Sequence, residues 1–241
     1  MKRLVQCRVV FCMLLVSGLL AAGQQADLKG KVQLTRNGHR ARNASKVVVW
    51  LTPVGNTLLE SPPPQKDSDI PKLVQKDKSF QPSLVVVPVG GRVEFPNHDP
   101  FFHNVFSLFD GKRFDLGLYE SGSTQFVRFD KPGISYIFCN IHAQMSAVVI
   151  ALNTPYYGLS DVRGEISIHG VVPGRYQLHL FHASVPQDAL HAQEREITVA
   201  PGDATIGTIT LAESDLEAAH KNKYGHDYDP PAPDNPAYAR P

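Results

Sequence analysis

The sequence predicts an all-β protein made of two sandwich-like or barrel-like units. Its apolar runs are short, rich in Val, Ile, Phe and Tyr, and bounded by Gly, Pro, Asn or Asp, as in residues 46–51, 83–95, 123–129, 134–138 and 146–152. Turn signals such as "VGG" and "DKPG" join neighbouring runs. A helical period is weak and occurs only over residues 213–221. Sheets rather than helices should therefore form the core.

The N-terminus has the pattern of a secretory signal. Three basic side chains lie within the first eight residues, residues 9–20 are apolar, and small residues follow up to Gly23. The alternative is a retained membrane anchor, but the apolar run is short for crossing a bilayer. We expect residues 1–23 to be removed, which leaves a periplasmic protein without a membrane span.

Signal cleavage changes the cysteine count and the net charge. It removes Cys7 and Cys12, so Cys139 is the one cysteine of the mature chain. Exported proteins usually pair their cysteines, and an unpaired one calls for another explanation, such as a metal ligand. The mature chain keeps 21 basic and 23 acidic side chains, a net charge of −2. Without a basic patch, nucleic acid is not an expected partner.

The remaining chain divides by composition. Residues 60–71, "ESPPPQKDSDIP", predict a Pro-rich linker. A β-rich block spans residues 72–153 and another spans residues 157–213, whereas residues 27–55 look like a strand, a turn and a strand that must pair elsewhere. The tail, residues 214–241, is rich in proline and charge and is expected to be disordered.

Four side chains in the first β-rich block suggest one metal site. Cys139, His142 and Met145 follow a C-x-x-H-x-x-M spacing at the end of a predicted strand, and His103 begins another strand 36 positions earlier. Two imidazoles and a thiolate in one plane, with a weak axial thioether, suit both Cu(I) and Cu(II). The pattern therefore predicts a mononuclear copper site for electron transfer.

Other interpretations explain the same residues less fully. A cysteine–histidine nucleophile pair has no need of Met145, and a structural zinc site normally has four good nitrogen or sulfur ligands. A metal-free fold in which these residues only pack is a further alternative. Copper storage or delivery would use the same ligands, but the sequence lacks a Met-rich run. A copper enzyme would need further sites such as H-x-H, which is absent, so we expect no catalytic activity.

Residues 72–153 resemble the cupredoxins, the small blue copper proteins of the plastocyanin, amicyanin and pseudoazurin type. "SFQPSLVVVPVGGRVEFPNHDPFFHNVFS" is similar to their early strands and first histidine, and "FDKPGISYIFCNIHAQM" is similar to their last strand and ligand loop, with the spacing of amicyanin. The resemblance implies a Greek-key barrel or sandwich that holds one type 1 copper ion, with His103, Cys139, His142 and Met145 as its ligands.

The same resemblance implies roles for the neighbouring residues. Asn104 would direct its backbone N–H toward the Cys139 sulfur from outside the ligand set, and His142 would be the electron exit. A redox partner would dock near His142 on an apolar rim formed by Phe101, Phe102, Ile141 and Ala143.

Residues 161–183 are similar to a second family. "DVRGEISIHGVVPGRYQLHLFHA" resembles carboxypeptidase regulatory-like or transthyretin-like β-sandwich modules, which have an immunoglobulin-like form, and residues 30–51 look like their first half. We hypothesise that the copper domain is inserted between two halves of this module, residues 27–55 and 157–213. The rival is that residues 27–55 add strands to the copper domain. The arrangement is similar to exported bacterial cupredoxin-domain proteins, some of them labelled methylamine-utilisation-like.

Overall fold

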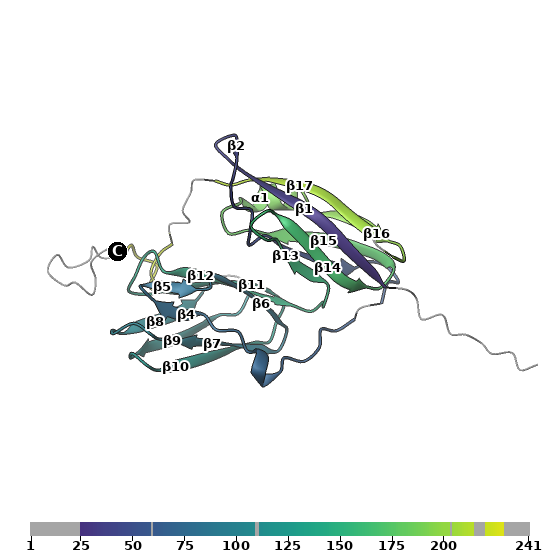
Figure 1. Cartoon of the computed structure of the whole chain (residues 1–241). Helices are drawn as coiled ribbons and strands as arrows, with labels where there is room; N and C mark the ends of the chain where they lie inside the picture. The colour runs from purple at the N-terminus through teal and green to yellow at the C-terminus, as the bar shows by residue number, and fades with distance from the viewer. Residues whose placement is uncertain (1–24, 59, 109–110, 203, 215–219, 229–241) are drawn as a thin grey trace, which may run out of the picture.

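The structure is a computed structural model that describes residues 25–58, 60–108, 111–202, 204–214 and 220–228. It is all-β, as predicted, with two groups of strands lying side by side (Figure 1). No helix in these described ranges is long and apolar enough to cross a bilayer. The predicted signal, residues 1–23, lies outside the described residues.

The first group of strands, which we call the flanking module, comes from both ends of the chain. One sheet has the order β14-β1-β17, with β2 paired to β1, and the other has the order β13-β3-β15-β16. The helix α1 (Gln187–His191) connects β15 to β16. The strands are β1 (Ala26–Arg36), β2 (His39–Arg40), β3 (Val48–Pro53), β13 (Tyr157–Leu159), β14 (Glu165–Val171), β15 (Gly174–Phe181), β16 (Arg195–Val199) and β17 (Ala204–Ala212).

The second group, which we call the central block, lies between β3 and β13 in the chain. Its main sheet has the order β6-β12-β11-β8-β9, and β10-β7 and β4-β5 form two smaller sheets. The strands are β4 (Val74–Lys76), β5 (Ser79–Gln81), β6 (Leu84–Pro88), β7 (Gly91–Pro96), β8 (His103–Ser107), β9 (Phe114–Tyr119), β10 (Thr124–Phe129), β11 (Gly133–Cys139) and β12 (Ser146–Leu152). They confirm the strands expected from the short apolar runs.

The N-terminal strands pair within the flanking module. β1 runs antiparallel to β14 and parallel to β17, and β3 runs antiparallel to β13 and β15, with Val49 opposite Leu180. In the described chain neither β1 nor β3 pairs with a strand of the central block. We infer from these pairings that the central block, with the linker of residues 60–71, is an insertion into the flanking module.

The linker is exposed but tied to the central block. It contains a 3₁₀ turn, η1 (Asp67–Asp69), and Gln65 exchanges two hydrogen bonds with the backbone of Arg92 on β7, at 2.7 and 3.0 Å. Asp67 also forms an ion pair with the Arg92 guanidinium. The chain is thus held against the central block as it enters it.

β12 contributes side chains to the cores of both groups of strands. Its side chains alternate between faces, as strands require: Val148, Ile150 and Leu152 join the core of the flanking module. Ala147, Val149 and Ala151 join the core of the central block. Because both faces are buried, the sequence of β12 is a continuous apolar run rather than an alternating one.

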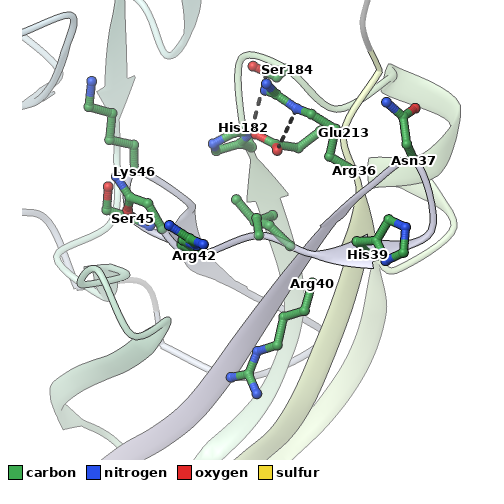
Figure 2. A pocket seen from close by; sticks show the side chains of 13 residues that line it. Arg36, Asn37, His39, Arg40, Arg42, Ser45, Lys46, His182, Ser184 and Glu213 are labelled. Carbon is green, nitrogen blue, oxygen red and sulfur yellow. Dashed lines mark hydrogen bonds and ion pairs between the residues drawn. The ribbon is translucent and has the colours of Figure 1, made fainter.

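The flanking module also carries a basic cavity of about 660 Å³ beside the segment that joins β1 to β3 (Figure 2). Its charged and imidazole side chains are Arg36, His39, Arg40, Arg42, Lys46, His182 and Glu213. Arg36 and Glu213 form an ion pair at 3.3 Å. We expected no basic patch from the sequence, yet five of these side chains lie within residues 36–46, and the fold brings His182 and Glu213 to them.

One expectation about the C-terminal part is not tested, and another needs correction. Residues 215–219, the centre of the segment with a weak helical period, lie outside the described residues, and the α-helix in the described ranges, α1, lies earlier in the chain. Residues 220–228 of the tail predicted to be disordered pack on the central block: the Tyr228 hydroxyl donates a hydrogen bond to the Cys139 carbonyl at 2.8 Å. Composition missed this because the partners of these side chains are distant in sequence.

Candidate metal centre

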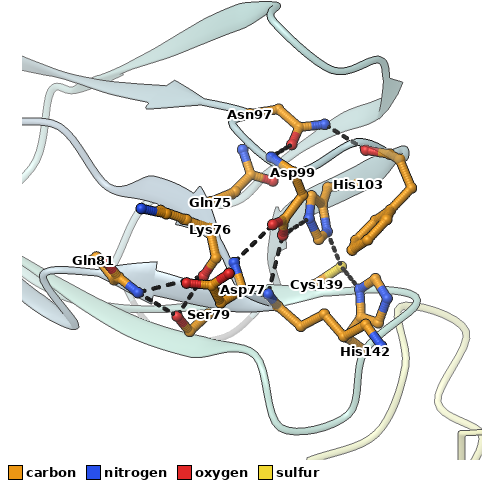
Figure 3. A network of polar contacts seen from close by, with 12 residues as sticks. Gln75, Lys76, Asp77, Ser79, Gln81, Asn97, Asp99, His103, Cys139 and His142 are labelled. Atoms are coloured by element: carbon orange, nitrogen blue, oxygen red, sulfur yellow. Dashed lines mark hydrogen bonds and ion pairs between the residues drawn. The ribbon is translucent and has the colours of Figure 1, made fainter. Parts of the chain in front are cut away.

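The fold brings His103 and Cys139 together at one end of the central block. His103 is the first residue of β8 and Cys139 is the last residue of β11. These strands are antiparallel neighbours, with Cys139 opposite Val105. The end of one strand therefore lies beside the start of the other, and residues 36 positions apart become neighbours (Figure 3).

The donor atoms of three predicted ligands converge. Nδ1 of His103 lies 3.5 Å from Sγ of Cys139, and Nδ1 of His142 lies 3.6 Å from the same sulfur. The three ligand atoms all lie within 4.8 Å of one another, and all three residues are buried. Bonds of about 2.0 Å to nitrogen and about 2.3 Å to sulfur, at a trigonal angle of about 120°, would separate the donors by about 3.7 Å. The residues present thus fit one metal ion held by two nitrogens and one sulfur.

The loop from Cys139 to Met145 is closed by its own backbone. The Cys139 N–H donates to the Met145 carbonyl at 3.1 Å, and the Met145 N–H donates to the His142 carbonyl at 3.0 Å. The Met145 side chain is completely buried in the same core as Cys139. The structure therefore places the predicted axial ligand on the same tight turn as the other two loop residues.

Asp99 is a site residue that the sequence did not reveal. Its carboxylate accepts a hydrogen bond from Nε2 of His103 at 2.8 Å. It also accepts the backbone N–H groups of Asp77 and Lys78, at 2.7 and 3.0 Å, in the turn between β4 and β5 (Figure 3). With Nε2 carrying the proton, Nδ1 of His103 presents its lone pair toward the Cys139 sulfur. Asp99 thus fixes the tautomer that a metal ion needs.

Hydrogen bonds keep Asp99 ionised despite its burial. Burial acts to raise the pKa of its carboxyl, but the hydrogen bonds from His103, Lys78 and Asp77 outweigh this and hold the pKa below its usual value. The signal in the sequence was the four-residue separation of Asp99 and His103. It was not distinctive, because the neighbouring His98, which is exposed, lies in the same polar loop.

Burial keeps the thiol and the two imidazoles of the site uncharged. Burial raises the pKa of the Cys139 thiol and outweighs the lowering effect of the backbone N–H groups of Asn104, Ile141 and His142. Burial lowers the pKa of His142 to about 4, assisted by the positive charges of His103 and Lys78. Burial also lowers the pKa of His103, against the raising effect of Asp99. At neutral pH both imidazoles are therefore neutral and able to donate to a metal.

These pKa values also weigh against the cysteine nucleophile. A reactive cysteine needs a lowered pKa and access to substrate, whereas the Cys139 thiol has a raised pKa and no exposed surface. A metal ion would itself deprotonate the thiol on binding. The geometry therefore favours a ligand over a nucleophile.

Asn104 links the two segments that carry the ligands. Its backbone N–H interacts with the Cys139 thiol, and its carbonyl accepts the N–H of Asn140 at 3.1 Å. Its side-chain amide donates to Asp115 at 2.6 Å. The backbone N–H of Asn104 thus acts on the Cys139 thiol, and its effect on a bound metal ion stays a prediction.

Phe101 of the predicted apolar rim lies beside His142. Phe101 is partly buried, and its ring centroid lies 5.3 Å from that of His103 and 5.5 Å from that of His142. Phe102 is 56% exposed, Ala143 is exposed and Ile141 is partly buried, whereas His142 itself is buried. The rim thus combines a covered imidazole with apolar side chains open to solvent.

Comparisons with known proteins add similarities of fold. No family model matches the chain, and no curated protein matches it. Among solved structures, it is similar to a Cu-containing nitrite reductase (NirK) from Thermus scotoductus SA-01, with 25% identity and a TM-score of 0.33 over 42% of this chain and 25% of that chain. The chain thus matches only a quarter of that nitrite reductase.

Two further similarities are to small copper proteins. The chain is similar to a purple cupredoxin from Nitrosopumilus maritimus, with 21% identity and a TM-score of 0.31 over 34% of this chain and 96% of that chain. It is also similar to a reduced Cu(I) form of an amicyanin variant, with 16% identity and a TM-score of 0.33 over 34% of this chain and 82% of that chain. At such TM-scores these similarities carry no weight for function, which must rest on the geometry of the site.

Proposed function

We propose that the chain is an exported type 1 copper protein of the cupredoxin class that carries single electrons between redox partners in the periplasm. The observation that carries the proposal is the convergence of His103 Nδ1, His142 Nδ1 and Cys139 Sγ in a buried site. Met145, buried in the same core as Cys139, would be the weak axial ligand. The signal of residues 1–23 would direct export to the periplasm and would then be removed.

A copper ion bound there would supply a one-electron couple, Cu(I)/Cu(II). The residues contribute rigidity: Asp99 orients His103, and the hydrogen-bonded turn holds His142 and Met145. Burial of all three convergent ligands keeps water from the site. Ligands that are already in place need little rearrangement when the charge of the ion changes, which favours fast electron transfer.

We propose a carrier rather than an enzyme. Within the described residues, one cluster of histidine, cysteine and carboxylate side chains brings its ligand atoms together, and that cluster is buried. A copper enzyme needs an open coordination position that substrate can reach. The partner would dock on the rim of Phe101, Phe102, Ile141 and Ala143, close to His142.

Voltammetry of the copper-loaded mature protein tests the proposal. We expect a reversible one-electron wave, and we expect Met145→Leu to raise the reduction potential, because a hydrocarbon no longer donates to the oxidised ion. The control is Leu159→Met, the reverse exchange at a 44% exposed position on β13 in the flanking module, which should leave the potential unchanged.

Voltammetry repeated in the presence of a Cu(I) chelator separates the carrier from the storage or delivery alternative. A carrier should hold copper through repeated oxidation and reduction in the presence of a Cu(I) chelator. Rapid loss of Cu(I) to the chelator, together with the absence of a reversible wave, would instead support delivery of the ion itself.

A further inference from the structure

Residues 220–228, which we call the C-terminal strap, pack on the segment that carries Cys139. The Tyr228 hydroxyl donates to the Cys139 carbonyl at 2.8 Å, and the Lys223 N–H donates to Oδ1 of Asn140 at 2.9 Å. The ring of His220 stacks on Phe138, with centroids 3.9 Å apart and an interplanar angle of 26°. Three consecutive residues at the end of β11 are therefore held by the strap, which is the yellow segment beside the central block in Figure 1.

The strap also reaches the segment that carries His103. The Lys223 ammonium forms an ion pair with Oδ2 of Asp115 on β9 at 2.9 Å. The other oxygen of Asp115 accepts the side-chain amide of Asn104, the residue that follows His103. Lys223 therefore connects to both ligand segments, through its backbone to Asn140 and through its side chain to Asp115.

The strap has internal bonds that give it a shape of its own. Asn222 and His226 are joined by a backbone hydrogen bond at 2.9 Å, and Lys221 pairs with Asp227 across the same turn. The Tyr228 hydroxyl also lies 3.1 Å from Nδ1 of His220. The two aromatic anchors at the ends of the strap are thus joined to each other as well as to β11.

We propose that the C-terminal strap is a clamp that holds the ligand loop in its metal-binding shape, with Tyr228 as a positioning residue of the site. The inference rests on the proposed function for its copper readout but can be tested without copper. A small displacement of ligands weakens a metal site strongly, and the strap holds Cys139 through its backbone carbonyl. Loosening the strap should therefore loosen the loop.

The test compares Tyr228→Phe with Tyr224→Phe in the full mature chain. Both changes keep the ring and remove one hydroxyl, but Tyr224 is 69% exposed and its hydroxyl is not bonded to β11 in the described contacts. In copper-loaded protein, transfer of Cu(I) to bathocuproine disulfonate should be about two- to tenfold faster for Tyr228→Phe, the range expected for one lost hydrogen bond. Tyr224→Phe should behave as the wild type.

Hydrogen exchange of the metal-free protein is the second readout. The amides of Cys139 and Met145 close the ligand loop, and both should exchange faster in Tyr228→Phe and in a chain ended at residue 219. If the wild type binds no copper, the proposed function fails and this exchange measurement still decides the clamp.

Two results would overturn the clamp. One is exchange and Cu(I) transfer in Tyr228→Phe equal to those of Tyr224→Phe. The other is an equally faster exchange throughout the central block, with a matching drop in the urea midpoint, since the change would then report global unfolding and not the loop.

Discussion

Asp99 is the residue on which the orientation of His103 depends. Its carboxylate joins the turn between β4 and β5 to Nε2 of His103, so the imidazole cannot rotate without breaking a charge-assisted hydrogen bond. A negative charge at this distance also stabilises the more highly charged ion of a metal couple. The same side chain therefore fixes geometry and tunes the proposed copper site.

Asp99→Asn should raise the reduction potential of the copper-loaded protein by tens of millivolts, roughly, because it removes one negative charge near the ion. Asp130→Asn is the control, since Asp130 is paired with Lys112 on the surface beyond the far end of β10. A spectroelectrochemical titration measures both. Equal potentials for Asp99→Asn and the wild type would show that the carboxylate does not act on the ion.

His182 provides a pH-dependent contribution away from the metal centre. It is 8% exposed, beside the ion pair of Arg36 and Glu213 (Figure 2), and burial lowers its pKa below the ordinary 6.5. Glu213 acts in the opposite direction, and Lys46 and Arg36 act with burial. Since the unfolded chain binds a proton at a pH where the folded chain does not, the free energy of unfolding should fall as the pH drops below 6.5.

This dependence can be measured by urea unfolding of the metal-free protein at pH 7.5 and 5.5. The wild type should lose more stability over that interval than His182→Gln, which has no proton to bind. Other buried histidines titrate in both proteins, so the difference isolates His182. Equal losses would mean that His182 is protonated as readily in the folded chain as in the unfolded one.

The convergence of His103, Cys139 and His142 could be predicted from the sequence because the chemical types of the candidate ligands are rare together. One cysteine, two histidines and a methionine in a C-x-x-H-x-x-M loop have few explanations. Asp99 could not be predicted in the same way, since a carboxylate in a polar loop is ordinary. Its role depends on its distance from His103, which only the tertiary structure sets.

At the scale of elements, β12 joins the central block to the flanking module. Ile150 on one face belongs to the core of the module, and Val149 on the other belongs to the core that contains Cys139 and Met145. The apolar run of residues 146–152 predicted a strand correctly. The run could not show which face of the strand packs on which core, because both faces are apolar.

Ile150→Ala should lower the free energy of unfolding by about 2–5 kcal/mol, as expected for a large-to-small change at a site that is 1% exposed. Leu118→Ala, at a 65% exposed position, should change it by less than about 0.5 kcal/mol. Urea unfolding of the metal-free protein gives both values. A loss below about 1 kcal/mol for Ile150→Ala would contradict a tightly packed junction.

The C-terminal strap shows where composition misleads. Residues 214–241 are rich in proline and charge, yet within them Lys223 and Tyr228 find partners on β9 and at the end of β11. Predictions from composition measure how much apolar surface a segment could bury on its own. They do not include hydrogen bonds offered by a folded neighbour.

At the scale of the whole molecule, strands that contribute to both cores predict that the two groups of strands unfold together. Trp50, the one tryptophan of the chain, lies on β3 in the flanking module, whereas the proposed copper site reports on the central block. Because β6 and β12 contribute to the module's core, loss of one group exposes the other.

Urea should therefore change tryptophan fluorescence and copper absorbance at the same midpoint. A protein of two independent domains would instead lose its copper colour and its native fluorescence at separate urea concentrations. Ile150→Ala, which weakens the junction, should draw the two midpoints apart, and Leu118→Ala should not.

The most direct test of the copper site is the combined visible and paramagnetic resonance spectrum of the oxidised, copper-loaded mature protein. Two nitrogens and one thiolate in the arrangement of His103, His142 and Cys139 predict an intense visible charge-transfer band, lost in Cys139→Ser. Copper-loaded protein that stays colourless after oxidation, or a band that persists in Cys139→Ser, would contradict the proposed site.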